Sequence, residues 1–123
     1  MKYLIMIYLN PEARALWESF PESERAAGLT FHEELKAELA ASGELVRSEA
    51  LVDWSQAKRV LVHEGRTQTT DGPFAEVKEF LAGFYLVDCV SLDRAVEIAA
   101  RMPESGLGTV EVRQVMESLA DFR

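Results

Sequence analysis

Apolar residues open the chain in a continuous run from Tyr3 to Leu9. A short apolar run that ends at a turn signal is typical of a buried strand. Asn10 and Pro11 come next, and they suit the cap and the first position of a helix. The apolar residues that then recur at helical spacing, as one expected buried stripe, are Ala13, Leu16, Trp17 and Phe20. The pattern predicts a strand followed by a helix that Pro21 interrupts.

A second helix is predicted to begin at Thr30. Thr30 and Glu33 have the spacing of a capping box, in which the two side chains satisfy backbone N–H groups at a helix start. Gly43 is placed to end this helix, because glycine adopts the left-handed conformation at low cost. The expected inward-facing residues are Phe31, Leu35, Leu39 and Ala40. Residues 44–53 then read as a strand.

Two extended runs, residues 58–63 and 66–70, predict a β-hairpin joined by a Glu64-Gly65 loop. Turn chemistry at Asp71, Gly72 and Pro73 closes the second run. A short irregular piece follows, and residues 83–90 read as the next buried strand.

The last third of the chain predicts one more helix and one more strand. Ser91 suits the helix cap, and Pro103 stops the helix. The expected inward residues are Leu92, Ala95, Val96, Ile98, Ala99 and Met102. Gly106 and Gly108 predict a loop, and residues 109–116 read as the final strand.

This order of elements predicts one α+β domain over residues 1–123, with the ferredoxin-like split βαβ arrangement and an antiparallel sheet. Two main helices cover only one face of such a sheet, and the other face carries apolar side chains. A homodimer that packs these faces together is the expected solution.

Charge narrows the range of partners. Asp and Glu number 21 against 13 Lys and Arg, so the formal net charge is -8. Phosphate contact needs clustered basic residues, and we therefore expect no nucleic acid and no anionic membrane surface as partner. Cys89 is the single cysteine, and no apolar run is long enough to span a bilayer. These features favour a cytoplasmic protein.

The segment from Asp71 to Glu79, with the sequence DGPFAEVKE, is the most distinctive part of the chain. Together with the GFYLV run from Gly83 and the late VEVRQV run from Val110, it resembles the DGPF branch of the YciI-like (YCII-related) family. The resemblance implies a ferredoxin-like fold that dimerises in the manner of dimeric α/β barrels. Some members of the branch are encoded beside extracytoplasmic-function sigma factors, which implies a regulatory context.

A related branch of the family is associated with dehydrochlorinase-type chemistry, centred on a histidine of the first main helix and an acidic partner. His32 lies eleven positions before Gly43, a spacing similar to that of the histidine and helix-end glycine in that branch. Histidine exchanges protons near neutral pH, so His32 is the first candidate for a general base. Where the branch has an Asp-Pro step before the last strand, this chain has Met102-Pro103, and the sequence identifies no acidic partner.

Asp71 is the second catalytic candidate, either as a turn cap or as a carboxylate that lines a pocket at the dimer cleft. Phe74 is expected to anchor its loop in the core. The charged residues that follow are candidates for ligand binding, with Lys78 holding an anionic group and Glu76 or Glu79 pairing with a basic residue.

Glu111 and Arg113 alternate with apolar residues on the last strand. If their face points into a dimer cavity, they are buried charges that need partners, and Tyr85 on a neighbouring strand was the expected third member. They read either as an ion-pair network or as part of a ligand site.

The sequence has no phosphate-binding glycine loop and no nucleotide or flavin fingerprint, so no cofactor is expected, and with two histidines and one cysteine no metal site is expected. Two functions remain open. One is a cofactor-free acid–base enzyme of lyase or isomerase type acting on a small molecule. The other is a non-catalytic dimeric module that senses a ligand or contacts a sigma-factor-linked regulator.

Overall fold

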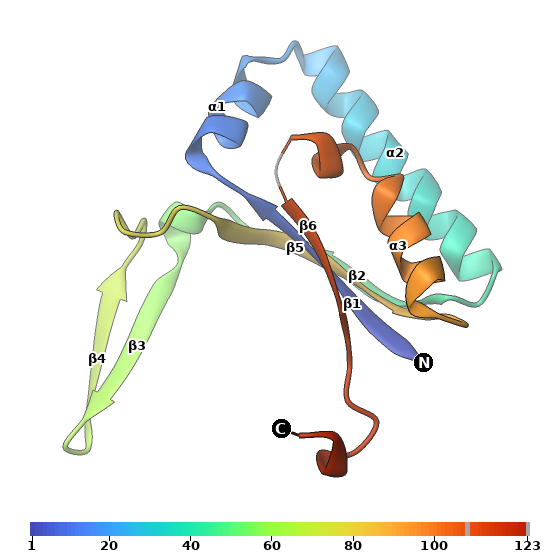
Figure 1. Ribbon diagram of the computed structural model, residues 1–123. Coiled ribbons are helices and arrows are strands. Elements are labelled where there is room, and N and C mark those ends of the chain that lie inside the picture. The colour runs from blue at the N-terminus through green and yellow to red at the C-terminus, as the bar shows by residue number, and fades with distance from the viewer. Residues whose placement is uncertain (108, 123) are drawn as a thin grey trace.

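The computed structural model describes residues 1–107 and 109–122 (Figure 1). Residue 123 and the predicted loop residue Gly108 lie outside this part. The helices and strands, in chain order, are β1 (Lys2–Leu9), α1 (Pro11–Ser19), α2 (Glu22–Ala41), β2 (Leu45–Ala50), β3 (Lys58–His63), β4 (Arg66–Asp71), β5 (Phe80–Asp88), α3 (Leu92–Ala100) and β6 (Thr109–Gln114). Short 3-10 turns occupy Trp54–Gln56, Pro103–Gly106 and Leu119–Asp121.

The main sheet has the strand order β2-β5-β1-β6, and every neighbouring pair is antiparallel. The helices lie over one face of this sheet (Figure 1). The α+β, ferredoxin-like prediction is therefore confirmed. None of the helices in the described residues has both the length and the apolar character needed to cross a membrane.

The core lies between the sheet and its helices. Alternation along β1 directs Tyr3, Ile5 and Ile7 toward this core, because successive side chains of a strand point to opposite faces. They pack with Leu35 and Leu39 of α2, which are about one helical turn apart and almost fully buried. Residues from β5 and α3 complete the cluster: Tyr85, Val87, Ala95, Ile98, Ala99 and Met102.

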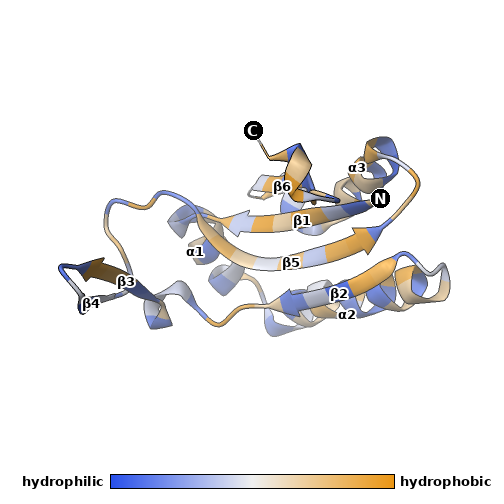
Figure 2. Cartoon of the chain, turned by 90° about the horizontal axis from the view of Figure 1, so that it is seen from below, coloured by the Kyte–Doolittle hydropathy of each residue, from blue (hydrophilic) through white to orange (hydrophobic). Residues whose placement is uncertain are grey.

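The opposite face of the sheet carries no helix (Figure 2). Leu4 and Met6 of β1 lie on this face, and Leu86 and Phe84 are their partners on β5. Because directly paired residues share a face, the four side chains form an apolar strip along the middle of the sheet. Figure 2 shows apolar residues along β1 and β5 from this side. We call this surface the open face.

The second helix begins earlier than the sequence predicts. Asn10 caps α1 as expected, with its side-chain oxygen accepting from the Ala13 N–H at 2.7 Å. Helix α2, however, already begins at Glu22, so the predicted start at Thr30 is wrong. The indole of Trp17 lies against Gly28, and this packing from α1 supports the first half of α2, overriding the local start signal.

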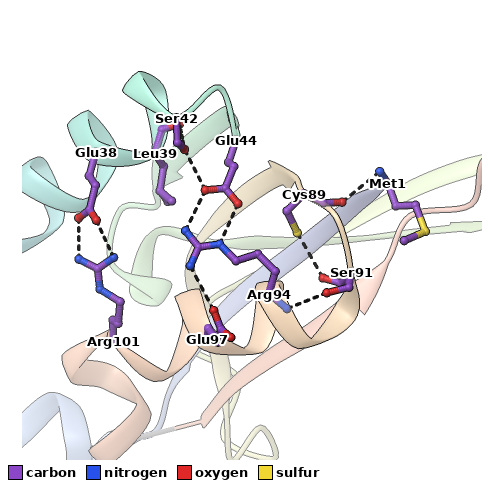
Figure 3. Close-up of polar contacts among 10 residues, drawn as sticks. All are labelled: Met1, Glu38, Leu39, Ser42, Glu44, Cys89, Ser91, Arg94, Glu97 and Arg101. Atoms are coloured by element: carbon purple, nitrogen blue, oxygen red, sulfur yellow. Dashed lines mark hydrogen bonds and ion pairs between the residues drawn. The ribbon is translucent and has the colours of Figure 1, made fainter.

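Ion pairs tie α3 and the residue after it to α2 and to the turn that follows α2 (Figure 3). The guanidinium of Arg94 donates to both carboxylate oxygens of Glu44 at 2.9 Å, and Arg101 makes the same two-pronged contact with Glu38. The hydrogen bonds from Arg94 lower the pKa of Glu44 to about 2. Gly43, with φ of +80°, makes the left-handed turn that the sequence predicts between α2 and β2.

The β3–β4 hairpin projects from the body of the molecule (Figures 1 and 2). Its loop residues Glu64 and Gly65 both have positive φ, as a two-residue hairpin turn requires. Every residue of the two strands is exposed, including Val60, Leu61 and Val62. The hairpin is therefore correctly predicted, but it contributes nothing to the core of its own chain.

Several element ends differ from the sequence prediction. Strand β2 ends at Ala50 and β6 at Gln114, both earlier than expected, while β5 begins earlier, at Phe80. Ser91 caps α3 as predicted, by accepting from the Arg94 N–H. The residues predicted inward but found exposed are Leu16, Ala40, Leu92 and Val96, which lie off the buried stripes of their helices.

Candidate functional site

His32 is held between the sheet and the end of α3. It lies one turn before Leu35 on α2, so its side chain leaves the helix on the core-facing side. Its Nδ1 lies 2.6 Å from the Tyr85 hydroxyl, and its Nε2 lies 2.6 Å from Oε1 of Glu104. The His32 side chain keeps 17% of its surface exposed, so it is positioned on two sides and still accessible.

Glu104 is the acidic partner that sequence reasoning missed. It belongs to the 3-10 turn Pro103–Gly106, which Pro103 starts directly after α3. Its second oxygen, Oε2, is buried and has no hydrogen-bond partner. The signal in the sequence was an acid directly after the proline in Met102-Pro103-Glu104, whereas the resemblance pointed to an acid directly before it.

Tyr85 faces the same histidine from β5 and is 2% exposed. Burial raises the pKa of Tyr85 to about 12, and the nearby Glu104 carboxylate adds to the rise. The phenol is therefore protonated at neutral pH and is able to donate to Nδ1 of His32. With its ring proton on Nε2, His32 then donates to Oε1 of Glu104, so both ring nitrogens have a hydrogen-bond partner.

A cavity of about 240 Å³ opens beside this cluster, between α2 and the β2 side of the sheet. His32, Tyr85 and Glu104 all line it. Its other polar lining residues are Glu33, Lys36, Ser48 and Glu49, and its apolar lining includes Ile7, Leu9 and Leu29. Lys36 is paired with Glu33 at 2.9 Å. The cavity therefore combines a proton-exchanging group with apolar walls, as ligand sites commonly do.

Asp71 lies elsewhere, at the end of the projecting hairpin. Its carboxylate pairs with Lys58 across the hairpin at 3.1 Å, and both side chains are exposed. The next residue, Gly72, donates its N–H to the Ala57 carbonyl, and a Cβ there would lie 2.5 Å from the Trp54 carbonyl oxygen. The Asp-Gly pair thus fixes the base of the hairpin, and Asp71 is not brought to His32.

Phe74 and Glu76 also belong to the hairpin base. Arg59 of β3 lies over the Phe74 ring, 4.0 Å from its centroid, and pairs with the Glu76 carboxylate. Phe74 is half-buried at this place and is absent from the core cluster, so the expectation of a core anchor is wrong. Lys78 and Glu79 are exposed beyond it.

Glu111 and Arg113 lie on the open face, opposite Met6 and Leu4 of β1. Tyr85 points to the other side of the sheet, toward His32, so the expected grouping of these three residues is wrong. The reason is register: Tyr85 pairs with the core-facing Ile5 on β1, while Glu111 pairs with the next residue, Met6.

Metal binding finds no support in the described ranges: no three His, Cys, Asp or Glu side chains within residues 1–107 and 109–122 are grouped to hold an ion. His32 and Glu104 are the one close histidine–carboxylate pair at the cavity in that part of the chain. A histidine ring paired with a carboxylate beside a cavity has the groups needed to exchange a proton with a bound molecule.

Comparison with known proteins agrees with this fold. The YCII-related domain matches residues 1–119. An uncharacterized protein of Rhizobium meliloti (strain 1021) is 32% identical over 115 residues, which cover 92% of this chain and 90% of the relative. The chain belongs to the YCII-related domain family.

Proposed function

We propose that this protein is a cofactor-free acid–base enzyme that binds a small molecule beside His32 and catalyses an elimination or an isomerisation. The observation that carries the proposal is the His32 ring, held by Tyr85 and Glu104 at 2.6 Å on its two nitrogens, at the wall of a cavity. A base oriented by a carboxylate and open to a ligand cavity is the arrangement that general acid–base catalysis requires.

The proton path follows from the two hydrogen bonds. Tyr85 donates to Nδ1 of His32, so its oxygen is the group that accepts a proton from a bound molecule. As that proton reaches the phenol oxygen, the original phenol proton passes to Nδ1, and His32 becomes the imidazolium. Because the raised pKa of Tyr85 disfavours a free phenolate, the two transfers are coupled.

Glu104 stabilises the charged intermediate state. Its carboxylate accepts from Nε2, so an imidazolium at His32 forms opposite a negative charge in a partly buried site. Returning the proton to a different atom of the substrate gives isomerisation. Its transfer to a leaving group gives elimination. Coupled groups of this kind contribute roughly 10²–10⁴-fold to a rate.

Deuterium exchange tests this function without a known substrate. Both reaction types begin here with removal of a proton from carbon, and a neighbouring carbonyl makes such a proton acidic enough to follow in a simple probe. The protein should therefore catalyse exchange of these protons in cyclohexanone and phenylacetone in D₂O, followed by NMR. His32→Gln should lose the catalysis, while Glu34→Gln, an exposed position on the same helix, should retain it. Equal exchange by His32→Gln and the wild type would contradict the proposal.

A homodimer is the proposed working unit. The open face presents Leu4, Leu86 and Phe84, and the projecting hairpin presents Val60 and Val62. The hairpin also carries three of the 13 basic residues and two of the 21 acidic ones, so it is more basic than the rest of the chain. A basic arm beside an acidic body favours contact between two copies.

Ligand sensing without turnover is the second candidate, because the same cavity serves it. The ion-paired, exposed Asp71 fits a structural role for the distinctive segment, as this candidate requires. Saturable ligand binding with no exchange chemistry, and retention of an adjacently encoded sigma factor in a pull-down, would favour sensing over catalysis.

A further inference from the structure

A second cavity lies on the other side of the His32–Glu104 pair. It has a volume of about 190 Å³ and shares four lining residues with the first cavity: Leu9, Leu29, His32 and Glu104. Apart from the histidine and the carboxylate, its lining is apolar and comes from the end of β1, from α1 and α2, and from the 3-10 turn after α3 with the residue that follows it. We call this cavity the rear chamber.

We propose that the rear chamber binds an uncharged, apolar, ring-sized part of the substrate, and that Gly28 sets the size of the group it accepts. This inference rests on the proposed function, because it places the rest of the substrate against Tyr85 and His32 in the first cavity. It adds the chemical class of the substrate and a residue that determines specificity.

The size of the rear chamber fits a ring. An apolar cavity of roughly 150 Å³ in a protein core is able to hold a benzene molecule. The rear chamber is of similar volume, and Trp17 and Ala13 form part of its wall. A six-membered ring therefore fits.

Gly28 keeps this space open. It lies within α2, where glycine is less favourable than alanine. Its φ is not in the left-handed region, so no backbone requirement explains it. A Cβ at this position would lie 3.3 Å from the Trp17 ring. The absent side chain is what allows the Trp17 ring to lie against the helix beside the chamber.

The charge of its lining makes the rear chamber unfavourable for an anionic ligand. Among the lining residues that the structure describes, the rear chamber has no lysine or arginine, and its charged group is the Glu104 carboxylate. The buried Oε2 of Glu104 has no partner, and a negative group beside it would be repelled. A neutral ring that carries a hydroxyl fits the shape of the chamber, and its hydroxyl is able to donate to the unpartnered oxygen of Glu104.

Leu29 gives such a molecule a route in. Its side chain is 62% exposed and lines both cavities. An exposed leucine at the junction of two cavities provides an apolar rim, and contact with a bound ring would remove that surface from water.

Binding of simple probes tests the inference. The Trp54→Phe variant of the full chain leaves Trp17, at the wall of the chamber, as the fluorescent indole. Benzyl alcohol and cyclohexylmethanol should change its emission saturably, and benzoate should bind at least about tenfold more weakly. Benzoate binding as tightly as benzyl alcohol would overturn the proposed class.

Substitution of Gly28 tests the chamber itself. In the same background, Gly28→Leu should weaken benzyl alcohol binding by about tenfold or more, and Gly28→Ala should have a smaller effect. Ala27→Leu, on the exposed side of the same helix, is the matched control and should bind as before. Circular dichroism confirms that each variant is folded. Unchanged binding in a folded Gly28→Leu, or no saturable binding by the parent, overturns the inference.

The two proposals fail separately. If the alcohols bind but deuterium exchange is absent, the rear chamber stands and the acid–base function falls. If exchange occurs and folded Gly28→Leu exchanges phenylacetone as fast as the wild type, the acid–base function stands and the rear chamber falls.

Discussion

Nε2 of His32 lies 2.6 Å from Oε1 of Glu104, across 72 positions of sequence. The contact joins the middle of α2 to the turn that follows α3, and it gives the helix histidine an acidic partner from a place where the sequence comparison did not find one. The Arg101–Glu38 and Arg94–Glu44 contacts hold α3 in its place beside α2. They therefore also determine the distance between His32 and Glu104.

Replacing Glu104 by Gln should lower catalysed deuterium exchange by about 10²-fold. The amide cannot stabilise an imidazolium as the carboxylate does, and it can also favour the other tautomer of His32 by donating to Nε2. Nitrogen NMR of the His32 ring should show the proton on Nε2 in the wild type. A wild-type ring with its proton on Nδ1 would contradict the assigned proton path.

Replacing Tyr85 by Phe should remove the first proton acceptor and lower exchange by a similar factor of about 10². Ultraviolet titration should also change, because the Tyr85 pKa of about 12 makes it ionise late. The Tyr85 hydroxyl loses its proton at a higher pH in the native state than in the unfolded chain. Its contribution to stability is complete below pH 10.0 and is lost as the pH rises toward about 12. Alkaline unfolding should therefore be less steep in Tyr85→Phe.

Replacing Glu44 by Gln should lower the free energy of unfolding at neutral pH by about 1–3 kcal/mol, since it breaks a charged, two-pronged hydrogen bond with Arg94. The folded-state pKa of Glu44 is lowered from 4.5 to about 2, so this stabilisation is present above pH 4.5 and is lost as the pH falls toward 2. Urea unfolding of both proteins across that range measures the convergence. Glu97→Gln, at an exposed pair with the same arginine, is the control and should cost about 0–1 kcal/mol.

Introducing charge on the open face should break the proposed dimer. Leu4→Lys with Leu86→Glu places two charges in the apolar strip between β1 and β5, and sedimentation should show a monomer where the wild type is a dimer. Leu92→Lys, on an exposed position of α3, should leave the dimer intact. A wild type that is monomeric at micromolar concentration would contradict the proposal before any variant is made.

The fold was predictable because its elements carry independent local signals. The apolar run of β1, the Asn10-Pro11 cap, the Glu64-Gly65 turn and the Ser91 cap each specify one element, and all four are found in the structure. The start of α2 was not predictable, because the Thr30 signal is local while the packing of Trp17 on Gly28 depends on how two helices meet.

The site was predictable only in part. His32 follows from the helix pattern and from the family resemblance. Glu104 does not, because a 3-10 turn after α3 decides where its carboxylate points. Asp71 was expected at the site because it belongs to the most distinctive segment, yet that segment shapes the base of a hairpin. Tyr85 on β5 and Glu111 on β6 lie on opposite faces of the sheet because of the register in which both strands pair with β1. The sequence of a single strand does not reveal that register.

The fully exposed β3–β4 hairpin has a consequence for how this chain opens. A lone two-stranded hairpin is marginally stable in water, so in an isolated chain its strands should separate while the main sheet remains intact. Its amide hydrogens should then exchange with solvent quickly at low protein concentration and slowly where copies associate, with proteolytic cleavage near Gly65 following the same trend. The β3–β4 hairpin would then be fully ordered only in the associated protein, and it would fold as two copies come together.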